Sequence, residues 1–389
     1  MRRVGLAAIA AGAVLVTATA ASASHHSSAK LPLALVPLQK AQLGAAGKSL
    51  KLDYGSGPQF ISNVGLKAFD VRNIVGTEEW EYPATVAYYS LDYGDPFTGS
   101  PGVMEIQTGV EQYKTPAAAR KGYAFWRHVD SSLRIIGPGG PWKKIDVPAV
   151  GPQHFAYLGT WQAPNLNPIV GLDEQVLAGK FVLALTVTAG SSTAAESIAP
   201  RLAHWLYRRF QPMLNGHLAG KPARLPRQPK PGPAAGAPDL PTIILQPSDV
   251  GQSQTPDVSK QYIPSLPALS TYEMTMTPAG LWDDGINEDI SWWPTATEAT
   301  YAEAYLRALT AKFYGNGSPV DLTGVGDNAT GSIADYGDNG SVAMVTLTSG
   351  QAGVFVDGVT TGAGPAPSDS DLQSLAQAAA NRLDAGLGP

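Results

Sequence analysis

The phrase "VDLTGVGDNATGSIADYG" occupies Val320–Gly337, and a related phrase, "IDVPAVGPQHFAYLG", occupies Ile145–Gly159. Both begin with an apolar residue, Asp and a second apolar residue, followed by two residues and Val-Gly. Both also close with a tyrosine within two residues of a glycine. Other segments repeat in the same order around the two phrases. We therefore interpret the chain as a duplicated domain in which this phrase leads into the same strand twice.

Strand-like segments make up most of the repeat. Each half opens with an apolar phrase, "LPLALVPLQKAQLG" from Leu31 and "LPTIILQPSDVG" from Leu240. Alternating aromatic and polar residues follow from Glu79 and again from Ser270, and an alternation of period two predicts strands. Further strands are predicted at "VMEIQTGVEQY", "EDISWWPTA", "KFVLALTVTAG", "SVAMVTLTSG" and "QAGVFVDGVTTG".

Two helices are predicted in each half. The first helix starts at Thr115-Pro116 and, in the second half, at the capping residue Thr297. The last helix starts at capping boxes, Thr193 to Glu196 and Ser370 to Gln373. Strands joined by short turns, including Asn339-Gly340, favour antiparallel pairing. We expect an α+β protein of two tandem domains, each an antiparallel β-sheet with flanking helices.

The N-terminus has the pattern of a secretory signal. Arg2 and Arg3 precede an apolar stretch over 4–16, and Ala-Ser-Ala follows at 21–23. This predicts a signal peptide over 1–23 and a secreted, extracellular protein. An uncleaved membrane anchor is the alternative, but the apolar stretch is shorter than the ~20 residues that span a bilayer. No later stretch has the pattern of a transmembrane segment.

Composition shifts divide the mature chain. Residues 24–30 are a flexible N-terminus, and 216–238 form a proline-rich basic linker that favours an extended spacer. The predicted domains are therefore 31–215 and 239–389, the second duplicating the first. The 389 residues include no cysteine, so the core alone must hold a secreted fold.

Charge differs between the two halves. From 240 onward there are 17 acidic and 4 basic residues, a net charge of −13, whereas 24–239 carries 15 acidic and 21 basic residues, a net charge of +6. The opposite signs predict a salt-sensitive contact between the two domains. No basic patch in a suitable context is present, so nucleic acid is not an expected partner.

The sequence shows no recognisable catalytic motif. None of the six histidines lies in the predicted second domain, and the chain has no cysteine. That domain therefore has no Ser-His-Asp or Cys-His nucleophile and no conventional zinc site. The chain also has no H-E-x-x-H, G-x-S-x-G or Walker pattern. We predict no catalytic residues and interpret the protein as not being an enzyme.

An acidic cluster in "WDDGINED" is the candidate metal site. Asp283, Asp284, Glu288 and Asp289 offer oxygen ligands on a tight turn, and calcium prefers such ligands. The segment lacks the twelve-residue calcium-loop pattern, so a solvated hairpin turn is the alternative. Calcium is therefore the only cofactor that the sequence suggests.

Aromatic residues are the candidate ligand-binding site. Trp282, Trp292, Trp293 and Tyr262 lie near one another in the sequence of the second half. Alternation along a strand places Trp292 and Trp293 on opposite faces, so one of the two is expected in the core. An exposed ring can stack on a sugar or line an apolar pocket, and core packing is the alternative.

The phrase from Val320 to Ala329, with its leading "LP" segment, strand pair, capped helix and closing helix, resembles a group of exported actinobacterial domains. These are cell-envelope lipoproteins and the extracellular sensor domains of receptor kinases, with a fold similar to the PsbP type. This chain departs from both in lacking cysteine, and it has no kinase domain. The resemblance implies a ligand-binding or envelope role without catalysis, and it carries no active-site residues to transfer.

Three functions are compatible with these patterns. The first is a secreted non-catalytic protein that binds a small or lipid-like envelope ligand or a protein partner. The second is a carbohydrate- or cell-wall-binding module that uses exposed tryptophan and tyrosine, and the third is an unrecognised hydrolase. Acidic pairs deep in a cleft would favour the hydrolase, and a flat aromatic strip would favour the wall-binding module.

Overall fold

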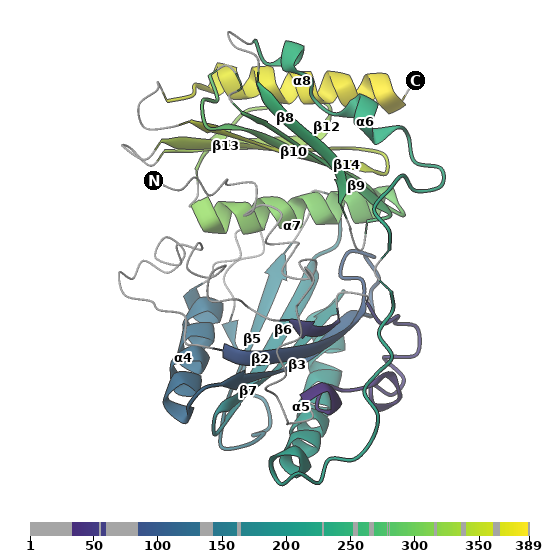
Figure 1. Cartoon of the computed structure of the whole chain (residues 1–389), viewed down its shortest axis with the longest axis vertical. Helices are drawn as coiled ribbons and strands as arrows, with labels where there is room; N and C mark the ends of the chain where they lie inside the picture. The colour runs from purple at the N-terminus through teal and green to yellow at the C-terminus, as the bar shows by residue number, and fades with distance from the viewer. Residues whose placement is uncertain are drawn as a thin grey trace. The chain divides into compact units, whose positions relative to one another are not determined.

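The computed structural model of the chain is shown in Figure 1. It describes residues 33–53, 56–59, 85–132, 143–161, 165–227, 229–251, 256–263, 268–277, 279, 281–314, 317–335, 340–360 and 366–387. The predicted signal peptide at 1–23 and N-terminus at 24–30 lie outside these residues, as does Asn339 of the predicted turn. By its internal contacts the chain forms two compact units, one of them from 229 onward and the other made of most of the residues before it.

The first domain is a seven-stranded antiparallel sheet with two long helices. Its strands are β1 (Gly57–Gln59), β2 (Thr85–Gly94), β3 (Val103–Tyr113), β4 (Lys143–Lys144), β5 (Gln153–Trp161), β6 (Ile169–Ala178) and β7 (Phe181–Ala189). They lie in the order β1-β2-β3-β7-β6-β5-β4. Its helices are the short η1 (Leu33–Leu35) and η2 (Lys40–Gln42) and the long α4 (Pro116–Ser132) and α5 (Ser192–Leu214).

The second domain repeats this arrangement. Its strands are β8 (Asp257–Ile263), β9 (Ser270–Thr277), β10 (Gly285–Trp292), β11 (Ser318–Val320), β12 (Asp327–Asp335), β13 (Ser341–Ser349) and β14 (Ala352–Thr360). Its helices are α6 (Leu240–Ile243), η3 (Pro247–Asp249), α7 (Ala296–Tyr314) and α8 (Asp369–Leu387). The strand order is β11-β12-β13-β14-β10-β9-β8, all antiparallel, which confirms the predicted α+β fold of two tandem domains.

Individual hydrogen bonds also recur at matched positions. Where the third strand of each domain ends, the Tyr113 amide donates to the Lys180 carbonyl at 2.9 Å, and the Trp293 amide donates to the Gln351 carbonyl at 2.8 Å. In the leading segments, the Leu38 amide donates to Oγ1 of Thr108 at 3.0 Å. The Leu245 amide correspondingly donates to Oε2 of Glu288 at 2.7 Å. The two domains therefore share not only strand order but the anchoring of their leading segments.

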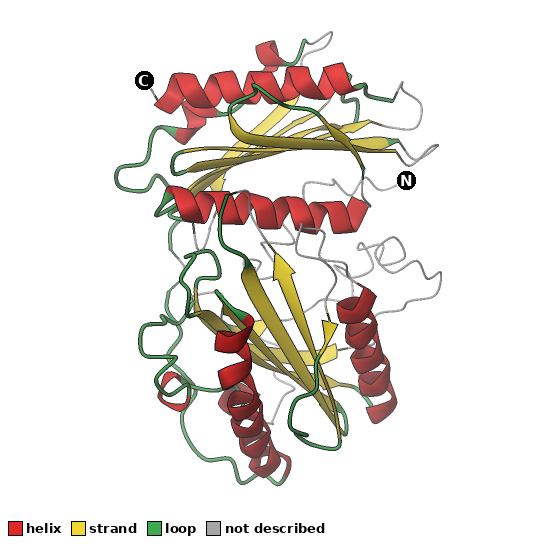
Figure 2. Cartoon of the chain, turned by 180° about the vertical axis from the view of Figure 1, so that it is seen from behind, coloured by secondary structure: helices red, strands yellow, loops and turns green. Residues whose placement is uncertain are grey.

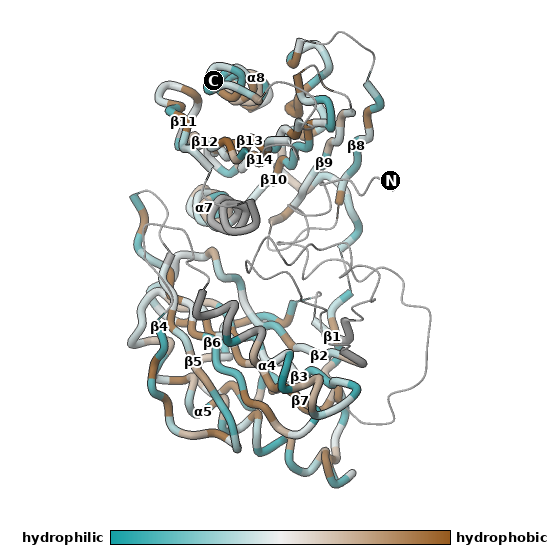
Figure 3. Tube along the Cα trace, turned by 90° about the vertical axis from the view of Figure 1, so that its left-hand side faces the viewer, coloured by the Kyte–Doolittle hydropathy of each residue, from teal (hydrophilic) through white to brown (hydrophobic). Residues whose placement is uncertain are grey.

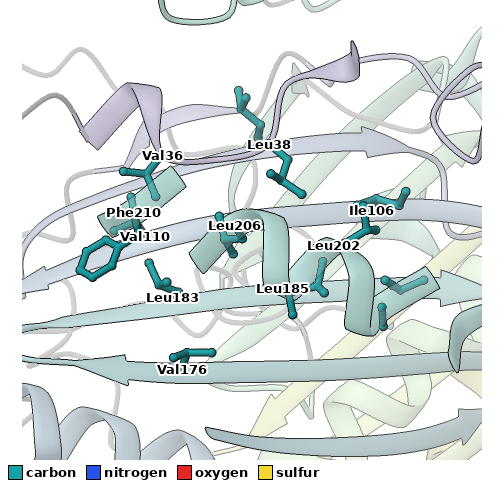
Figure 4. Packing of buried hydrophobic residues seen from close by; sticks show 14 of the residues in the cluster. Val36, Leu38, Ile106, Val110, Val176, Leu183, Leu185, Leu202, Leu206 and Phe210 are labelled. Carbon is teal, nitrogen blue, oxygen red and sulfur yellow. The ribbon is translucent and has the colours of Figure 1, made fainter. Parts of the chain in front are cut away.

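Each sheet has one apolar face that carries the main core. In the first domain, side chains of β2, β3, β6 and β7 pack against α5, as Figure 4 shows for Ile106, Leu185, Leu202, Leu206 and Phe210. In the second domain, the equivalent face packs against α6 and α8. The hydropathy colours of Figure 3 show apolar residues recurring along the strands of both sheets. Alternation along a strand sends the intervening residues to the opposite face, which α4 or α7 covers.

In the second domain, α7 and α8 lie on opposite faces of the sheet, as Figures 1 and 2 show from two sides. We call the sheet face covered by α7 the α7 face. We call the face that packs against α8 the α8 face.

The starts of α4 and α7 agree in part with the starts predicted from the sequence. Thr115 caps α4 as predicted, because the Ala118 amide donates to its Oγ1 at 3.1 Å. In the second domain the cap is Thr295 and not Thr297, since the Glu298 amide donates to Thr295 Oγ1 at 3.1 Å. Thr295 and Thr297 both match the capping pattern, and the end of the preceding strand favours the earlier of the two.

The predicted capping boxes of the closing helices are also two residues late. Ser191 caps α5, so Thr193 lies inside the helix. Ser368 caps α8 and forms a capping box with Asp371, whose carboxylate accepts from the Ser368 amide at 2.8 Å. Ser370 is therefore a residue of the first helical turn.

The linker over 216–238 contains no helix or strand among its described residues. Its first part is attached to the first domain, since Leu225 packs on that core and Gln39 Nε2 donates to the Lys221 carbonyl at 2.7 Å. Its second part is attached to the second domain, where Ser270 Oγ donates to the Gly232 carbonyl at 2.9 Å. Among the described residues, no helix is long and apolar enough to cross a membrane.

Candidate functional site

The four aromatic candidates are mostly packing residues. Trp282 and Trp293 are each only 4% exposed, and Trp282 belongs to the core of the second domain. Trp292 is half-buried against the same core. Tyr262 is half-buried and meets the ring of Tyr272 edge-on, with centroids 4.8 Å apart. These rings do not form the exposed flat strip that a wall-binding surface requires.

The four acidic candidates do not converge on one point. Asp283 and Asp284 are exposed in the turn between β9 and β10. This position agrees with the alternative interpretation of the segment as a solvated hairpin turn. Glu288 lies on the α8 face and accepts the Leu245 amide. Asp289 follows it in β10 and therefore points to the α7 face. Among the described residues, no group of three acidic or histidine side chains is placed to hold a metal ion.

The α7 face of the second sheet is polar at its centre. In β10 the residues that alternate with the core positions Ile286 and Ile290 are Asn287, Asp289 and Ser291. The facing residues of β9 are polar as well, and Oγ of Ser291 lies 2.8 Å from Oγ1 of Thr271. A strand with one apolar and one polar face normally turns the polar face to water, but here α7 covers the same side of the sheet.

Three carboxyl groups gather on this face, and we call them the α7 carboxyl cluster: Asp289 of β10, Asp357 of β14 and Glu303 of α7. Asp357 lies opposite Asn287 in the sheet, and Asn287 Nδ2 donates to its Oδ2 at 2.9 Å. The Glu303 carboxyl lies against Gly353 of β14, where a Cβ atom would collide with its Oε1. This glycine therefore makes room for the glutamate.

Asp357 and Glu303 are buried and incompletely hydrogen-bonded, whereas Asp289 is half-buried. Asp357 is 2% exposed and Glu303 is 4% exposed. Within the described part of the chain, Oδ1 of Asp357 and Oε2 of Glu303 have no hydrogen-bond partner. Buried polar atoms in native proteins are almost always partnered, and these two belong to a larger set of unpartnered buried atoms among the described residues that also includes both carboxylate oxygens of Glu174.

Burial dominates the electrostatics of the cluster. It raises the pKa of Asp289 to about 8, with further contributions from the charges of Glu273, its cross-strand neighbour, and Asp357. Burial, followed by the charge of Asp289, raises the pKa of Glu303 well above its ordinary value. Burial also raises the pKa of Asp357 to about 6, although the Asn287 hydrogen bond works in the opposite direction. No described basic group contributes to any of these three shifts.

Apolar residues border the cluster on the same face. Met344 of β13 lies directly opposite Asp357, and Val342 lies opposite Val359. These three apolar residues form a small buried cluster of their own. Since α7 packs over both β13 and β14, the covered space combines carboxyl groups with an apolar border.

The same face of the first domain has a different content. A buried aromatic cluster fills it beneath α4, with members Tyr113, Tyr123, Phe155 and Tyr157. The rings of Tyr123 and Phe155 lie 5.0 Å apart between centroids, and those of Phe155 and Tyr157 lie 5.5 Å apart. The same face also carries buried carboxyls, since Asp92 lies between the core positions Leu91 and Tyr93, and Glu111 follows the core position Val110.

A separate carboxyl pair lies on β2 and β3 of the first domain. Asp92 is 6% exposed and shares a hydrogen bond with Glu105, which also accepts from Thr188 Oγ1 at 2.8 Å. Burial, followed by the charge of Glu105, raises the pKa of Asp92 well above its ordinary value. Burial raises the pKa of Glu105 to about 7. Two coupled carboxyls are a common arrangement for proton transfer.

The sequence analysis named Asp289, but it did not identify Glu303 or Asp357. Asp357 is the lone acidic residue in the apolar strand "QAGVFVDGVTTG", and that isolation was a usable signal. Glu303 follows the buried Ala302 in α7. Only the pairing of β10 with β14 beneath α7 brings the three residues together.

No protein-family model and no curated protein matches the chain. Two solved structures show weak similarity. The extracellular domain of PknH from Mycobacterium tuberculosis has 13% identity and a TM-score of 0.32, over 48% of this chain and 99% of that chain. The di-domain ARO/CYC BexL from the BE-7585A biosynthetic pathway has 8% identity and a TM-score of 0.15, over 83% of this chain and 92% of that chain. These similarities are too low to support an argument, so the function must be argued from the geometry.

Proposed function

We propose that the protein is a secreted, non-catalytic binding protein that holds a small ligand between α7 and the sheet of its second domain. The observation that carries this proposal is the pair of buried oxygens without partners, Asp357 Oδ1 and Glu303 Oε2. Leaving a buried polar group unpartnered costs about 1–3 kcal/mol, and more for a charged group. A ligand that donates hydrogen bonds to both oxygens would remove that cost.

Sequence features support secretion and a binding role. The pattern over 1–23 is that of a signal peptide, and the resemblance to exported envelope domains implies ligand binding without catalysis. The second domain contains no histidine or cysteine that the carboxyls could activate as a nucleophile or use as a base partner. Binding is therefore the simplest use of this site.

The Asp92–Glu105 pair favours a hydrolase as the second candidate function. Two buried carboxyls that share a hydrogen bond and whose pKa values are both raised can act as general acid and general base. This candidate concerns the first domain and is independent of the α7 carboxyl cluster. Turnover of chromogenic glycosides or esters that disappears in an Asp92→Asn variant would establish it.

Native mass spectrometry of the full chain, secreted and purified from its own host, tests the binding function. The wild type should carry a non-covalent adduct that is released on gentle unfolding. A double variant, Asp357→Asn with Glu303→Gln, should lose the adduct. A matched control with the exposed turn residues changed, Asp283→Asn with Asp284→Asn, should keep it. An apo mass for all three proteins, or equal adducts on all three, would contradict the proposal.

A further inference from the structure

We propose that the first domain attaches the protein to an anionic lipid membrane through a basic surface formed by α5, the leading segment (33–52) and the start of the linker (216–227). We call it the α5 surface. Its members are the exposed residues Lys40, Lys48, Lys51, Arg201, Trp205, Arg208, Lys221, Arg224 and Arg227. Because these side chains are exposed, they take no part in the helix–sheet interfaces, and the inference is independent of the proposed small ligand.

Basic residues are segregated from acidic ones in the segments that form this surface. Residues 33–52 and 197–227 together contain nine lysines and arginines and no aspartate or glutamate. In the whole chain the acidic residues outnumber the lysines and arginines, 32 to 27, so this segregation is local. Eight of the nine side chains are exposed, and the ninth, Arg209, is half-buried. The segments themselves therefore supply no carboxylate to neutralise the surface.

Contacts between the segments join these charges into one surface. Arg209 of α5 donates through Nε to the Val36 carbonyl at 3.2 Å, which ties the helix to the leading segment. Figure 1 shows the leading segment, in purple, beside α5. The start of the linker is tied to the same segment, since Gln39 Nε2 donates to the Lys221 carbonyl at 2.7 Å. The fold thus brings together basic residues from two distant parts of the sequence.

An exposed tryptophan lies within the charged face of α5. Trp205 is 43% exposed, and the Arg208 guanidinium lies 5.7 Å from the centre of its ring. Arg201 and Arg208 lie four residues before and three residues after Trp205, so the three side chains share one helix face. At a membrane surface, an indole places its apolar body toward the acyl chains and its N–H toward the head groups. The ring therefore favours a lipid surface over a soluble anionic polymer.

The geometry of α5 restricts this attachment to the membrane surface. The apolar side of the helix is already occupied, because Leu202, Leu206 and Phe210 pack in the core of the first domain. Attachment therefore depends on phosphate contacts of the exposed lysines and arginines, with Trp205 at the level of the head groups. Such charges act over a screening length of about 8 Å at physiological ionic strength. The local charge of the α5 surface then decides the attraction, and the net charge of −5 for the whole chain does not.

The helix on the other face of the sheet provides a natural control. In α4, Arg120 and Arg127 are exposed and have the same seven-residue spacing as Arg201 and Arg208. The residue between them at the place of Trp205 is Ala124. This helix therefore carries the same pair of charges without the ring.

Flotation of the secreted protein with lipid vesicles tests the inference. Vesicles of phosphatidylcholine alone are neutral, whereas vesicles of equal parts phosphatidylcholine and phosphatidylglycerol are anionic. The protein should float only with the anionic vesicles. Binding should disappear at about 1 M salt, where the screening length falls to about 3 Å. Phosphatidylglycerol with brominated acyl chains should quench tryptophan fluorescence on binding, because Trp205 enters the head-group layer.

Variants separate the charge of the α5 surface from its ring. Arg201→Gln with Arg208→Gln should weaken partitioning about tenfold or more, since one basic residue near an anionic membrane contributes about fivefold. Arg120→Gln with Arg127→Gln removes the same charge from α4 and should change partitioning less than about twofold. Trp205→Ala should remove most of the quenching. Circular dichroism checks that each variant, all of them at exposed positions, is folded.

Several outcomes would overturn the inference. These are binding to neither kind of vesicle, equal binding to both, and equal losses in the α5 and α4 double variants. Binding of soluble polyphosphate as tight as binding to the vesicles, without quenching by the brominated lipid, would assign the α5 surface to an anionic polymer. Self-association at low salt that the α5 double variant loses, without vesicle binding, would assign the surface to the acidic second domain of another copy.

Discussion

The interface between the first helix and the sheet differs most between the two domains. In the first domain, Tyr123 of α4 packs into an aromatic cluster. In the second, Glu303 occupies the same place, eight residues after the capping threonine in both helices. Strand order, caps and leading-segment hydrogen bonds are shared. One topology thus accepts either an aromatic ring or a carboxyl at this helix position, and the sheet beneath the helix carries buried carboxyls in both domains, such as Asp92 and Asp357.

The opposite faces of the two sheets are alike and explain why this divergence is tolerated. Both pack an apolar core against the closing helix, α5 or α8. Because that core supplies most of the apolar burial, the other face can carry polar groups at a bearable cost in stability. We infer that the first domain is the structural member of the pair and the second is the binding member.

Placing a glutamate at position 123, which matches Glu303 of the second domain, should give the largest effect. Tyr123→Glu places a carboxyl among Phe155 and its neighbours and removes an aromatic ring. We expect the first domain to lose about 4 kcal/mol of unfolding free energy or more. Hydrogen-exchange mass spectrometry, which reports each domain through its own peptides, measures this. Glu303→Gln is the control, with a change of about 1 kcal/mol, and equal effects of the two variants would break the comparison.

The stability of the second domain should fall as pH rises. The folded pKa of Asp289 is raised to about 8, above its unfolded value, so the folded state binds more protons between about pH 4 and pH 8. Its contribution is fully present at low pH and is lost through this window, and we expect a loss of about 3 kcal/mol between pH 5 and pH 8. Denaturant unfolding followed by hydrogen exchange measures it. Asp289→Asn should flatten the curve, and a pH-independent wild type would be inconsistent with a desolvated cluster.

Glu174 allows the two domains to be compared on their core faces, the sheet faces that pack against α5 and α8. It is 1% exposed among apolar side chains of β6, both its oxygens lack partners, and the matched residue of the second domain is Val345. Burial raises its pKa to about 8. Glu174→Gln should therefore stabilise the first domain by about 2 kcal/mol at pH 7 and by nothing near pH 4.5. A destabilised variant at pH 7 would show that the carboxylate has a partner in solution.

The smallest effect concerns the helix starts. Ser368→Ala removes the cap of α8 and should cost about 1 kcal/mol. Ser370→Ala, two residues later inside the helix, should change stability by less than about 0.5 kcal/mol. Thermal unfolding of the two variants side by side decides which serine is the cap. If Ser370→Ala were instead the more destabilising variant, the start of α8 predicted from the sequence would be correct.

The sequence predicted the fold because its signals were periodic and local. The alternation around Ser270 and the Thr115-Pro116 start each match an element of the structure. Helix starts at Thr297, Thr193 and Ser370 were placed two residues late. Neighbouring hydroxyl residues satisfy the same pattern, and tertiary context selects among them.

The candidate site could be predicted only in part because it is built by long-range pairing. Asp289 was recognised for its acidic neighbours, yet Asp283 and Asp284 lie in an exposed turn and Glu288 points to the other face. Glu303 lies in the next helix, and Asp357 is separated from Asp289 by that helix and three strands. A local sequence pattern cannot show which distant residues will pack together. A single acidic residue in a buried strand, however, indicates that its side chain has an unusual environment.

A crystal structure of the protein as secreted by its own host tests the central claim most directly. The account predicts density for a bound molecule between α7 and β14, with donors in hydrogen-bond contact with Asp357 Oδ1 and Glu303 Oε2. If both oxygens are instead bonded to protein side chains or to ordered water alone, the second domain is a second structural unit and not the binding member of the pair.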